Sequence, residues 1–243
     1  MNYNSFKETI RKSCLINNLK VLAIIPARGG SKGLHMKNIR PLLDKPLIEW
    51  TILAANESQY IDKTILSSDD SEIIKTVENL DCEIPFVRPN DLATDNAKAH
   101  EVIAHSLNCF KDYDIFVYLQ PTSPLRVVQD IDTSIFEMVH GDFRSAVSIC
   151  KTGENPFCVF VKNNETMTPL FENYFGMNRQ ELPMTFRLNG AIYSGHRNVV
   201  LSEKQVTDHS NCFYYQMPIE RSIDIDNLED FLKAEKYLAS HLS

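Results

Sequence analysis

Short apolar runs alternate with stretches of helical spacing over the first 150 residues of the chain. Runs at 19–25, 64–68, 84–87, 115–119 and 146–150 predict strands, and the fully apolar run at 115–119 is typical of a central parallel strand. Between them, apolar residues recur at steps of three and four in 46–57, 71–80, 100–110 and 130–139, which predicts helices. This alternation indicates right-handed βαβ units and therefore an α/β fold with a doubly wound sheet.

The alternation stops after about residue 150. Runs at 157–161, 191–194 and 213–216 predict further strands, and Leu228, Phe231, Ala234 and Leu238 predict a last helix. A segment rich in large apolar side chains lies between these strands, and it could form either a core or a contact surface: Phe171, Tyr174, Phe175, Met177. We therefore expect an N-terminal extension (1–18), a main domain (19–150 and 217–243) and an inserted segment (151–216).

Polar blocks follow the predicted strands directly. The first of them contains three glycines and three cations: Gly29, Gly30, Gly33, Arg28, Lys32, Lys37. Glycine lets backbone N–H groups approach a ligand, and N–H groups among cations form an anion site, for which phosphate is the usual ligand. A solvated basic turn is the alternative. The spacing fits neither a P-loop nor the dinucleotide fingerprint. Because ligands bind at the carboxyl ends of parallel strands, we expect this loop, 67–70, Arg88 and 120–126 to form one cleft.

The overall composition limits the possible partners. The 243-residue chain has 25 Lys and Arg against 32 Asp and Glu, so its net charge of −7 argues against general nucleic-acid binding. The six cysteines are scattered, which favours reduced thiols and a cytoplasmic protein. The sequence contains no apolar run of transmembrane length and no signal-peptide pattern, so we expect no membrane partner.

Five blocks, in this order, resemble the acylneuraminate cytidylyltransferases, a family that includes CMP-sialic, CMP-legionaminic and CMP-pseudaminic acid synthetases. They are the loop at 23–38, Arg88-Pro89-x-x-Leu92-Ala93, the 120–126 block Gln-Pro-Thr-Ser-Pro-Leu-Arg, the 189–193 block Asn-Gly-Ala-Ile-Tyr and the 222–226 block Ser-Ile-Asp-Ile-Asp. The resemblance implies a Rossmann-like (GT-A-like) nucleotidyltransferase fold, with a mostly parallel sheet flanked by helices and a smaller dimerisation insertion. It also implies a homodimer that uses CTP, a nine-carbon α-keto acid sugar and Mg²⁺ to make precursors of cell-surface glycans.

The resemblance further assigns roles to single residues. The catalytic set would be Arg28, Lys37, Asp224 and Asp226. The nucleotide would be held by Arg28, Gly29, Gly30, Ser31, Lys32, Asn38 and Arg88, with Lys37 at the α-phosphate. The sugar would be held by Gln120, Arg179, Gln180, Asn189 and Tyr193, with Arg179 from the same or the partner subunit. Without the motif, Lys37 would be taken for a surface lysine, and Arg88 could instead be a structural ion-pair partner.

The sequence departs from the family pattern at one position. Ala99 stands where the family often has a serine that touches the base, and alanine has no hydroxyl. Lys98 and His100 are the neighbouring candidates to replace that contact.

Asp224 and Asp226 alternate with Ile223 and Ile225, which predicts a strand with both carboxylates on one face. Two adjacent carboxylates suit Mg²⁺. Alternatively, Asp226 and Glu229 could form a capping box for the last helix, and the two roles are compatible.

The resemblance, together with these patterns, implies a CTP-dependent cytidylyltransferase. In the expected reaction the anomeric C2 hydroxyl of the sugar attacks the α-phosphorus of CTP, and pyrophosphate leaves. No residue pattern identifies the general base or distinguishes one nine-carbon sugar from another. The alternatives are a transferase for an eight-carbon keto acid sugar, a catalytically silent nucleotide-binding paralogue and, disfavoured by the glycine spacing, a dinucleotide-dependent oxidoreductase.

Overall fold

The computed structural model describes residues 16–30 and 33–241 of the chain. Most of the expected N-terminal extension (1–18), as well as Ser31 and Lys32 of the glycine-rich loop, therefore lies outside the described residues. The centre is a six-stranded sheet in the order β10-β6-β9-β5-β1-β4. Its strands are β1 (Val21–Pro26), β4 (Lys63–Ser67), β5 (Ile115–Tyr118), β6 (Ser145–Lys151), β9 (Phe186–His196) and β10 (Cys212–Gln216).

Every strand pair in the sheet is parallel except those of β9, which runs antiparallel to both β5 and β6. Alternate residues of β1 pack on opposite sides: Val21 and Ala23 contact the core that includes α2 and α5, whereas Leu22 and Ile24 contact the core that includes α4 and α6. Both faces of the sheet are thus covered by helices, which explains why the central strands β1 and β5 are apolar and almost fully buried. The expected α/β architecture is confirmed.

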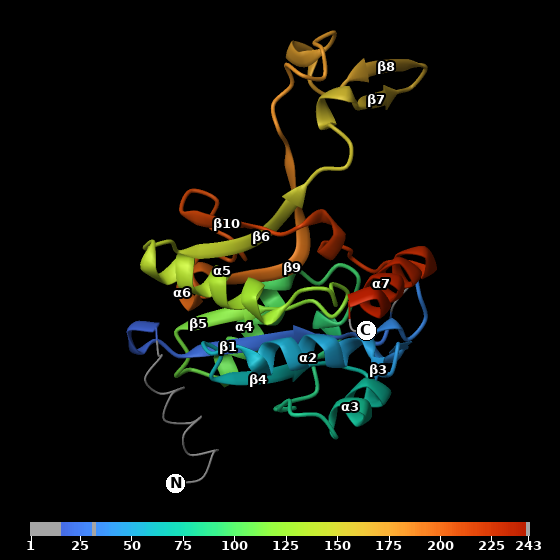
Figure 1. Cartoon of the computed structure of the whole chain (residues 1–243). Helices are drawn as coiled ribbons and strands as arrows, with labels where there is room; N and C mark the ends of the chain where they lie inside the picture. Colours follow the sequence, from blue (N-terminus) through green and yellow to red (C-terminus); the bar gives the residue numbers. More distant parts are fainter. Residues whose placement is uncertain (1–15, 31–32, 242–243) are drawn as a thin grey trace.

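The α-helices are α2 (Leu47–Glu57), α3 (Ser71–Val77), α4 (Ala99–Cys109), α5 (Val128–His140), α6 (Arg197–Leu201) and α7 (Leu228–His241). Short 3₁₀ turns are η1 (Ile16–Asn18), η2 (Lys37–Ile39), η3 (Asn90–Leu92), η4 (Pro156–Cys158), η5 (Glu172–Tyr174) and η6 (Ile219–Arg221). The C-terminal helix α7 packs against Leu34, Leu125 and Ile225, which lie on loops after the strands (Figure 1). Within the described residues, no helix is long and apolar enough to cross a membrane.

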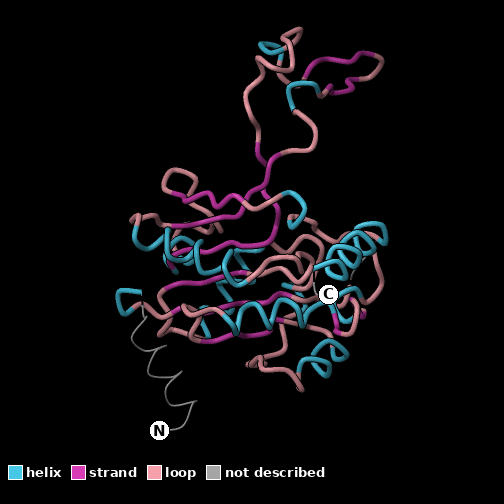
Figure 2. The backbone as a smooth tube through the Cα atoms, in the orientation of Figure 1, coloured by secondary structure: helices cyan, strands magenta, loops and turns pink. Residues whose placement is uncertain are grey.

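A long arm leaves the sheet between β6 and β9 (Figure 1). It carries the hairpin β7 (Phe160–Asn163) and β8 (Thr166–Pro169), and the rest of it is mostly loop (Figure 2). No side chain between residues 151 and 188 is buried. The expected boundary of the inserted segment (151–216) needs correction, because β9 and β10 belong to the central sheet. The part of the inserted segment that projects away from the main domain is only about 152–185.

Two further predictions of strands were wrong in detail. The run 84–87 forms only one isolated bridge, Ser68 with Val87, and a second bridge, Ile65 with Glu83, lies just before it. Pro85 has no N–H to donate to a continuous ladder. The run 157–161 begins as the turn η4, with Pro156 in its first position, and becomes strand only from Phe160. Apart from the strand predicted at 223–226, which is irregular, the other predicted strands and helices of the main domain are confirmed, with ends shifted by a few residues.

Candidate active site

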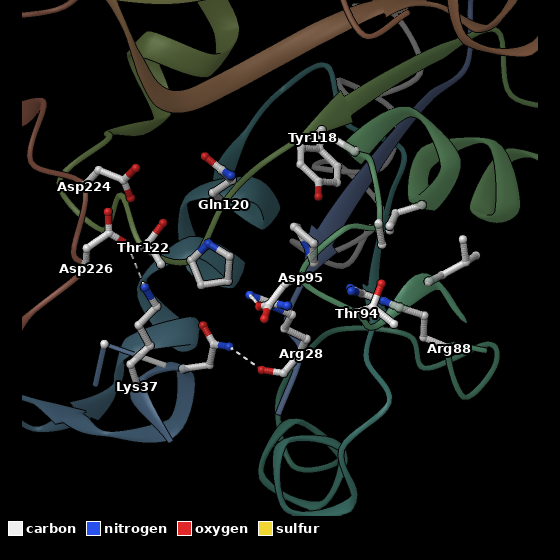
Figure 3. A pocket seen from close by; sticks show the side chains of 18 residues that line it. Arg28, Lys37, Arg88, Thr94, Asp95, Tyr118, Gln120, Thr122, Asp224 and Asp226 are labelled. Carbon is white, nitrogen blue, oxygen red and sulfur yellow. Dashed lines mark hydrogen bonds and ion pairs between the residues drawn. The ribbon is translucent and has the colours of Figure 1, made fainter. Parts of the chain in front are cut away.

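A polar pocket of about 450 Å³ lies at the carboxyl ends of β1 and β5. Seven of the predicted residues line it: Arg28, Lys37, Asn38, Arg88, Gln120, Asp224, Asp226. They come from separate parts of the sequence, and parallel strands bring them together because the loops after those strands share one edge of the sheet. Lys37, Asp224 and Asp226 lie at one end of the pocket and Arg88 at the other (Figure 3).

The glycine-rich loop is held close to its neighbours on both sides. The N–H of Gly29 donates a hydrogen bond to Asp69 Oδ1 at 3.3 Å. Gly33 lies so close to the 222–226 segment that a Cβ there would be 2.1 Å from the backbone oxygen of Asp226. A side chain at position 33 would therefore push the loop away from Asp226, which gives this glycine a steric role.

Two of the cations in the pocket are already paired with carboxylates. Arg28 Nη2 lies 2.6 Å from Asp95 Oδ1. Lys37 Nζ lies 3.2 Å from Asp226 Oδ1 and donates to the backbone oxygen of Ile225 at 2.6 Å. The side chain of Lys37 is only 14% exposed. The alternative interpretation of Lys37 as an ordinary surface lysine is therefore not supported.

Arg88 is buried and forms the far wall of the pocket. Its Nε donates to Ser67 Oγ at 3.0 Å, and its Nη2 donates to the backbone oxygen of Ser67. Burial lowers the pKa of Arg88, and the nearby Arg28 lowers it further, whereas the charge of Asp69 raises it. Arg88 makes no ion pair within the described residues, so the alternative of a structural ion-pair partner is not supported. Asn38 is also buried and donates to the backbone oxygen of Arg28 at 3.2 Å.

Several lining residues lie outside the blocks that the sequence singled out: Thr94, Asp95, Ala97, Val102, Tyr118. Ala99 lines the pocket as expected, but Lys98 and His100 do not, so neither replaces the missing hydroxyl. Thr94 and Tyr118 supply hydroxyls to the pocket, and burial raises the pKa of Tyr118 to about 12. The sequence contained one signal for Tyr118: it lies two residues before Gln120, and residues two apart in a strand point to the same face.

Gln120 is fixed from two sides. The buried Arg126 donates to the backbone oxygen of Gln120, to that of Ala191 at 2.9 Å and to Thr51 Oγ1 at 2.7 Å. Burial lowers the pKa of Arg126 to about 9. Gly190, with φ of +79°, lies directly behind the carboxamide, and a Cβ there would be 2.7 Å from Gln120 Oε1. The backbone of Gln120 is therefore held by Arg126, and the absence of a side chain at position 190 leaves room for its carboxamide in the pocket.

Asp224 and Asp226 lie on an irregular segment rather than on the predicted strand. The segment is held by the N–H of Ile225, which donates to the backbone oxygen of Thr122 at 2.7 Å, and not by a strand partner. Asp224 Oδ1 is buried and has no hydrogen-bond partner among the described residues. Burial raises the pKa of Asp224; the charge of Asp226 also raises it, while a hydrogen bond with Thr122 and the charge of Lys37 lower it.

The predicted capping box between Asp226 and Glu229 is shifted by one residue. Asp230 Oδ2 accepts from the N–H groups of Asp226 and Asn227, both at 3.2 Å, and Asn227 Oδ1 accepts from Asp230 N–H at 3.0 Å. The side chain of Asp226 therefore takes no part in capping α7. It faces the pocket and Lys37 instead (Figure 3).

The remaining residues predicted for the sugar are not in this pocket. Asn189 is buried, with its side chain accepting from Ser148 Oγ at 2.6 Å and donating to Ser222 Oγ at 2.9 Å. This side chain holds the start of the 222–226 segment and does not line the pocket, and its contact with the sugar stays a prediction. Tyr193 is half-buried on β9, and its pKa is raised by burial and by the charge of Asp224. Arg179 and Gln180 are exposed on the arm, and neither lines the pocket of its own chain.

Comparisons with known proteins identify the family. The family model described as Cytidylyltransferase matches residues 22–237. An N-acylneuraminate cytidylyltransferase from Escherichia coli O18:K1:H7 is 34% identical over 218 residues, which cover 87% of this chain and 50% of that protein. A CMP-N,N'-diacetyllegionaminic acid synthase from Legionella pneumophila is 31% identical over 227 residues, which cover 90% of this chain and 97% of that protein.

The chain thus spans about half the length of N-acylneuraminate cytidylyltransferases that it matches, but nearly all of the Legionella relative. Among solved structures, a CMP:2-keto-3-deoxy-manno-octonic acid synthetase complexed with CTP has the same fold. It superposes with a TM-score of 0.70 at 18% identity, covering 91% of this chain and 99% of its own. The family match over most of the sequence, together with the pocket at the carboxyl ends of the strands, shows that the chain belongs to the cytidylyltransferase family.

Proposed function

We propose that the chain is a CTP-dependent transferase that transfers CMP from CTP to the anomeric C2 hydroxyl of a nine-carbon α-keto acid sugar. The observation that carries this proposal is the convergence of Arg28, Lys37, Gln120, Asp224 and Asp226 in one pocket. Nucleotidyl transfer needs cations for the phosphates, carboxylates for a metal ion and a hydrogen-bonding group for the acceptor, and the pocket provides all three. Relatives of similar sequence are named for nine-carbon sugars of this type.

The charged groups suggest how the reaction proceeds. Arg28 would bind the β- and γ-phosphates through its planar fork of donors. Lys37, at the other end of the pocket, would approach the α-phosphate and stabilise the charge that develops on it. Arg88 and Asn38 would hold the base and the ribose, and Gln120 would orient the sugar hydroxyl. Pyrophosphate would then leave from the side of Arg28.

The two carboxylates fit Mg²⁺. Asp224 offers a buried oxygen without a hydrogen-bond partner among the described residues, and Asp226 offers an exposed carboxylate two residues away. Mg²⁺ is commonly held by one or two carboxylates together with substrate phosphates and water, so two protein ligands are sufficient. When bound, the ion would supply positive charge to the phosphate oxygens. Asp226 would then exchange Lys37 for the metal, which frees the lysine for the nucleotide.

The arm supports the proposal of a homodimer. Its apolar side chains are exposed in a single chain, with Phe175 63% and Met184 67% exposed, and Phe160 and Met167 also exposed. An exposed apolar surface of this kind suits an interface between subunits. Since Arg179 and Gln180 lie on the arm, they would reach the sugar pocket of the partner rather than that of their own chain.

The first experiment is pyrophosphate release from CTP and Mg²⁺ with a panel of sugars. The panel contains sialic, legionaminic and pseudaminic acids and one eight-carbon keto acid sugar. We expect turnover with one of the nine-carbon sugars and loss of turnover in Asp224→Ala. Turnover of only the eight-carbon sugar would show that the sugar assignment is wrong, and CTP binding without turnover of any sugar would favour a silent nucleotide-binding protein.

A further inference from the structure

Asp95 is a pocket residue to which neither the sequence motifs nor the proposed reaction gives a role. Its carboxylate pairs with Arg28 at 2.6 Å, inside the pocket proposed for CTP. The other ion pair of the pocket, Lys37 with Asp226, has an evident function because Asp226 is a proposed metal ligand. Asp95 lies elsewhere, near the middle of the pocket and beside Arg28 (Figure 3).

The backbone position of Asp95 allows its side chain to move. Asp95 belongs to a turn between η3 and α4, which is closed by the N–H of Ala97 donating to the backbone oxygen of Thr94 at 3.3 Å. The side chain of Asp95 is 40% exposed, and that of Arg28 is 34% exposed. The Asp95 side chain therefore borders solvent beside Arg28, on a turn outside the helices and the sheet.

A carboxylate and a phosphate compete for the same face of a guanidinium. Both bind the parallel N–H donors of arginine in a fork, so Arg28 cannot hold Asp95 and a phosphate in this way at once. A phosphate that displaces Asp95 also leaves a like charge close by. Binding of the outer phosphates of CTP is thus opposed by Asp95, and their release as pyrophosphate is assisted by it.

We propose that Asp95 is an internal competitor for Arg28 that weakens the hold on the β- and γ-phosphates and promotes release of pyrophosphate. This inference rests on the proposed function in one respect, namely that Arg28 contacts those two phosphates. The α-phosphate, which stays with the product, would lie near Lys37 and is not subject to this competition. Asp95 would therefore lower the affinity for pyrophosphate without lowering the affinity for the CMP part of the ligand.

The test compares three ligands on matched variants. Asp95→Asn removes the charge and keeps the size of the side chain, whereas Asp95→Glu keeps the charge. Asp91→Asn, at an exposed position in η3 outside the pocket lining, makes the same change in net charge and is the control. Calorimetric titration without sugar would give the affinities for pyrophosphate, CTP and CMP, and Asp95→Ala provides a second charge-removing variant.

In Asp95→Asn we expect pyrophosphate and CTP to bind about fivefold more tightly, the effect of removing one like charge at a partly exposed site. Affinity for CMP should stay within about twofold, and Asp91→Asn and Asp95→Glu should match the parent protein. Unchanged affinity for pyrophosphate would overturn the inference. Equal tightening of CMP would also overturn it, because the effect would then be general electrostatics. These readouts need no turnover, so failure of CMP transfer to every sugar would refute the proposed function separately.

Discussion

Asp224 and Asp226 are two residues apart but have different surroundings. Asp224 has a buried oxygen with no hydrogen-bond partner in the described part of the chain, whereas Asp226 is exposed and paired with Lys37. A buried carboxylate whose pKa is raised destabilises the folded protein once it ionises. Its contribution to stability is therefore most favourable below the ordinary pKa of 3.8 and is lost as the pH rises through the raised pKa in the folded state. A metal ion at this position would offset that cost.

Asp224→Asn should therefore raise the stability of the folded protein and lower its activity. Without metal, we expect the variant to melt at a higher temperature than the parent at pH 7, and the difference should disappear below pH 3.8. Activity should fall at least about 100-fold. Loss of a residue that only supports a metal ligand costs up to about 100-fold, and loss of a ligand itself should cost at least as much. Thermal melting across pH and initial rates measure the two effects. Asp226→Asn is the control, and it should lose activity without gaining stability.

Gly190 is the second residue whose function depends on its surroundings. Its φ of +79° disfavours any side chain, and a Cβ would also lie 3.2 Å from Asp224 Oδ2, in addition to its clash with Gln120. Gly190→Ala should lose about 1–3 kcal/mol of stability through backbone strain. We expect kcat/KM for the sugar to fall about 10- to 100-fold, because Gln120 is displaced. Gly153→Ala, where a Cβ meets nothing within 4 Å, should change neither quantity.

At the scale of elements, an ion pair between the buried Asp130 and the partly buried Arg221 joins α5, β10 and η6. Asp130, in the first turn of α5, accepts hydrogen bonds from both Nη atoms of Arg221, with the Nη2 bond at 2.9 Å, and from Tyr215 Oη at 3.0 Å. It also accepts from the N–H of Val127 at 2.9 Å. Because Arg221 directly precedes the 222–226 segment, this pair determines where the proposed metal ligands lie.

Asp130→Asn should leave Arg221 without its partner and cost about 3–5 kcal/mol of stability, the usual cost of breaking a buried pair. Urea unfolding measures that loss. We also expect a higher Mg²⁺ requirement, because the 222–226 segment is held less firmly. Glu229→Gln removes an exposed pair with Lys233 on α7, at 2.7 Å, and should have no measurable effect. Wild-type stability in Asp130→Asn would contradict this account of the segment.

At the scale of the whole molecule, the arm has no buried side chain of its own and projects away from the sheet (Figure 1). A few aromatic contacts, such as the stacking of Phe157 on Tyr174 with ring centroids 4.1 Å apart, are its main internal packing. An arm built in this way gains most of its stability by packing on another surface. The homodimer proposed above provides such a surface.

Mixed dimers can test whether the arm acts in the partner's site. Subunits carrying Asp224→Ala and subunits carrying Arg179→Ala are co-expressed with different tags and purified as heterodimers. If Arg179 serves the partner, one of the two sites has both residues, and we expect about half of wild-type activity, although each parent homodimer is nearly inactive. If Arg179 serves its own chain, neither site is complete and the heterodimer stays inactive.

The sequence by itself determined the α/β class, most strands and helices of the main domain, and the glycine-rich loop. These depend on apolar periodicity and on local chemistry, and both are encoded within short segments. It also indicated seven of the pocket residues. Arg28, Lys37, Arg88 and Gln120 belong to polar blocks after parallel strands, which meet at one edge of the sheet. Asn38, Asp224 and Asp226 were indicated mainly by the family resemblance.

Only the tertiary structure decided what depends on contacts between distant segments. It placed β9 in the central sheet, antiparallel to its neighbours, and assigned Asn189 to the interior, because strand order and burial follow from packing of the whole chain. It also showed Asp95 paired with Arg28, 67 residues earlier in the sequence, and a buried oxygen of Asp224 that has no hydrogen-bond partner within residues 16–30 and 33–241. Neither feature has a local sequence signal, since pairing and burial depend on which surfaces the fold brings together.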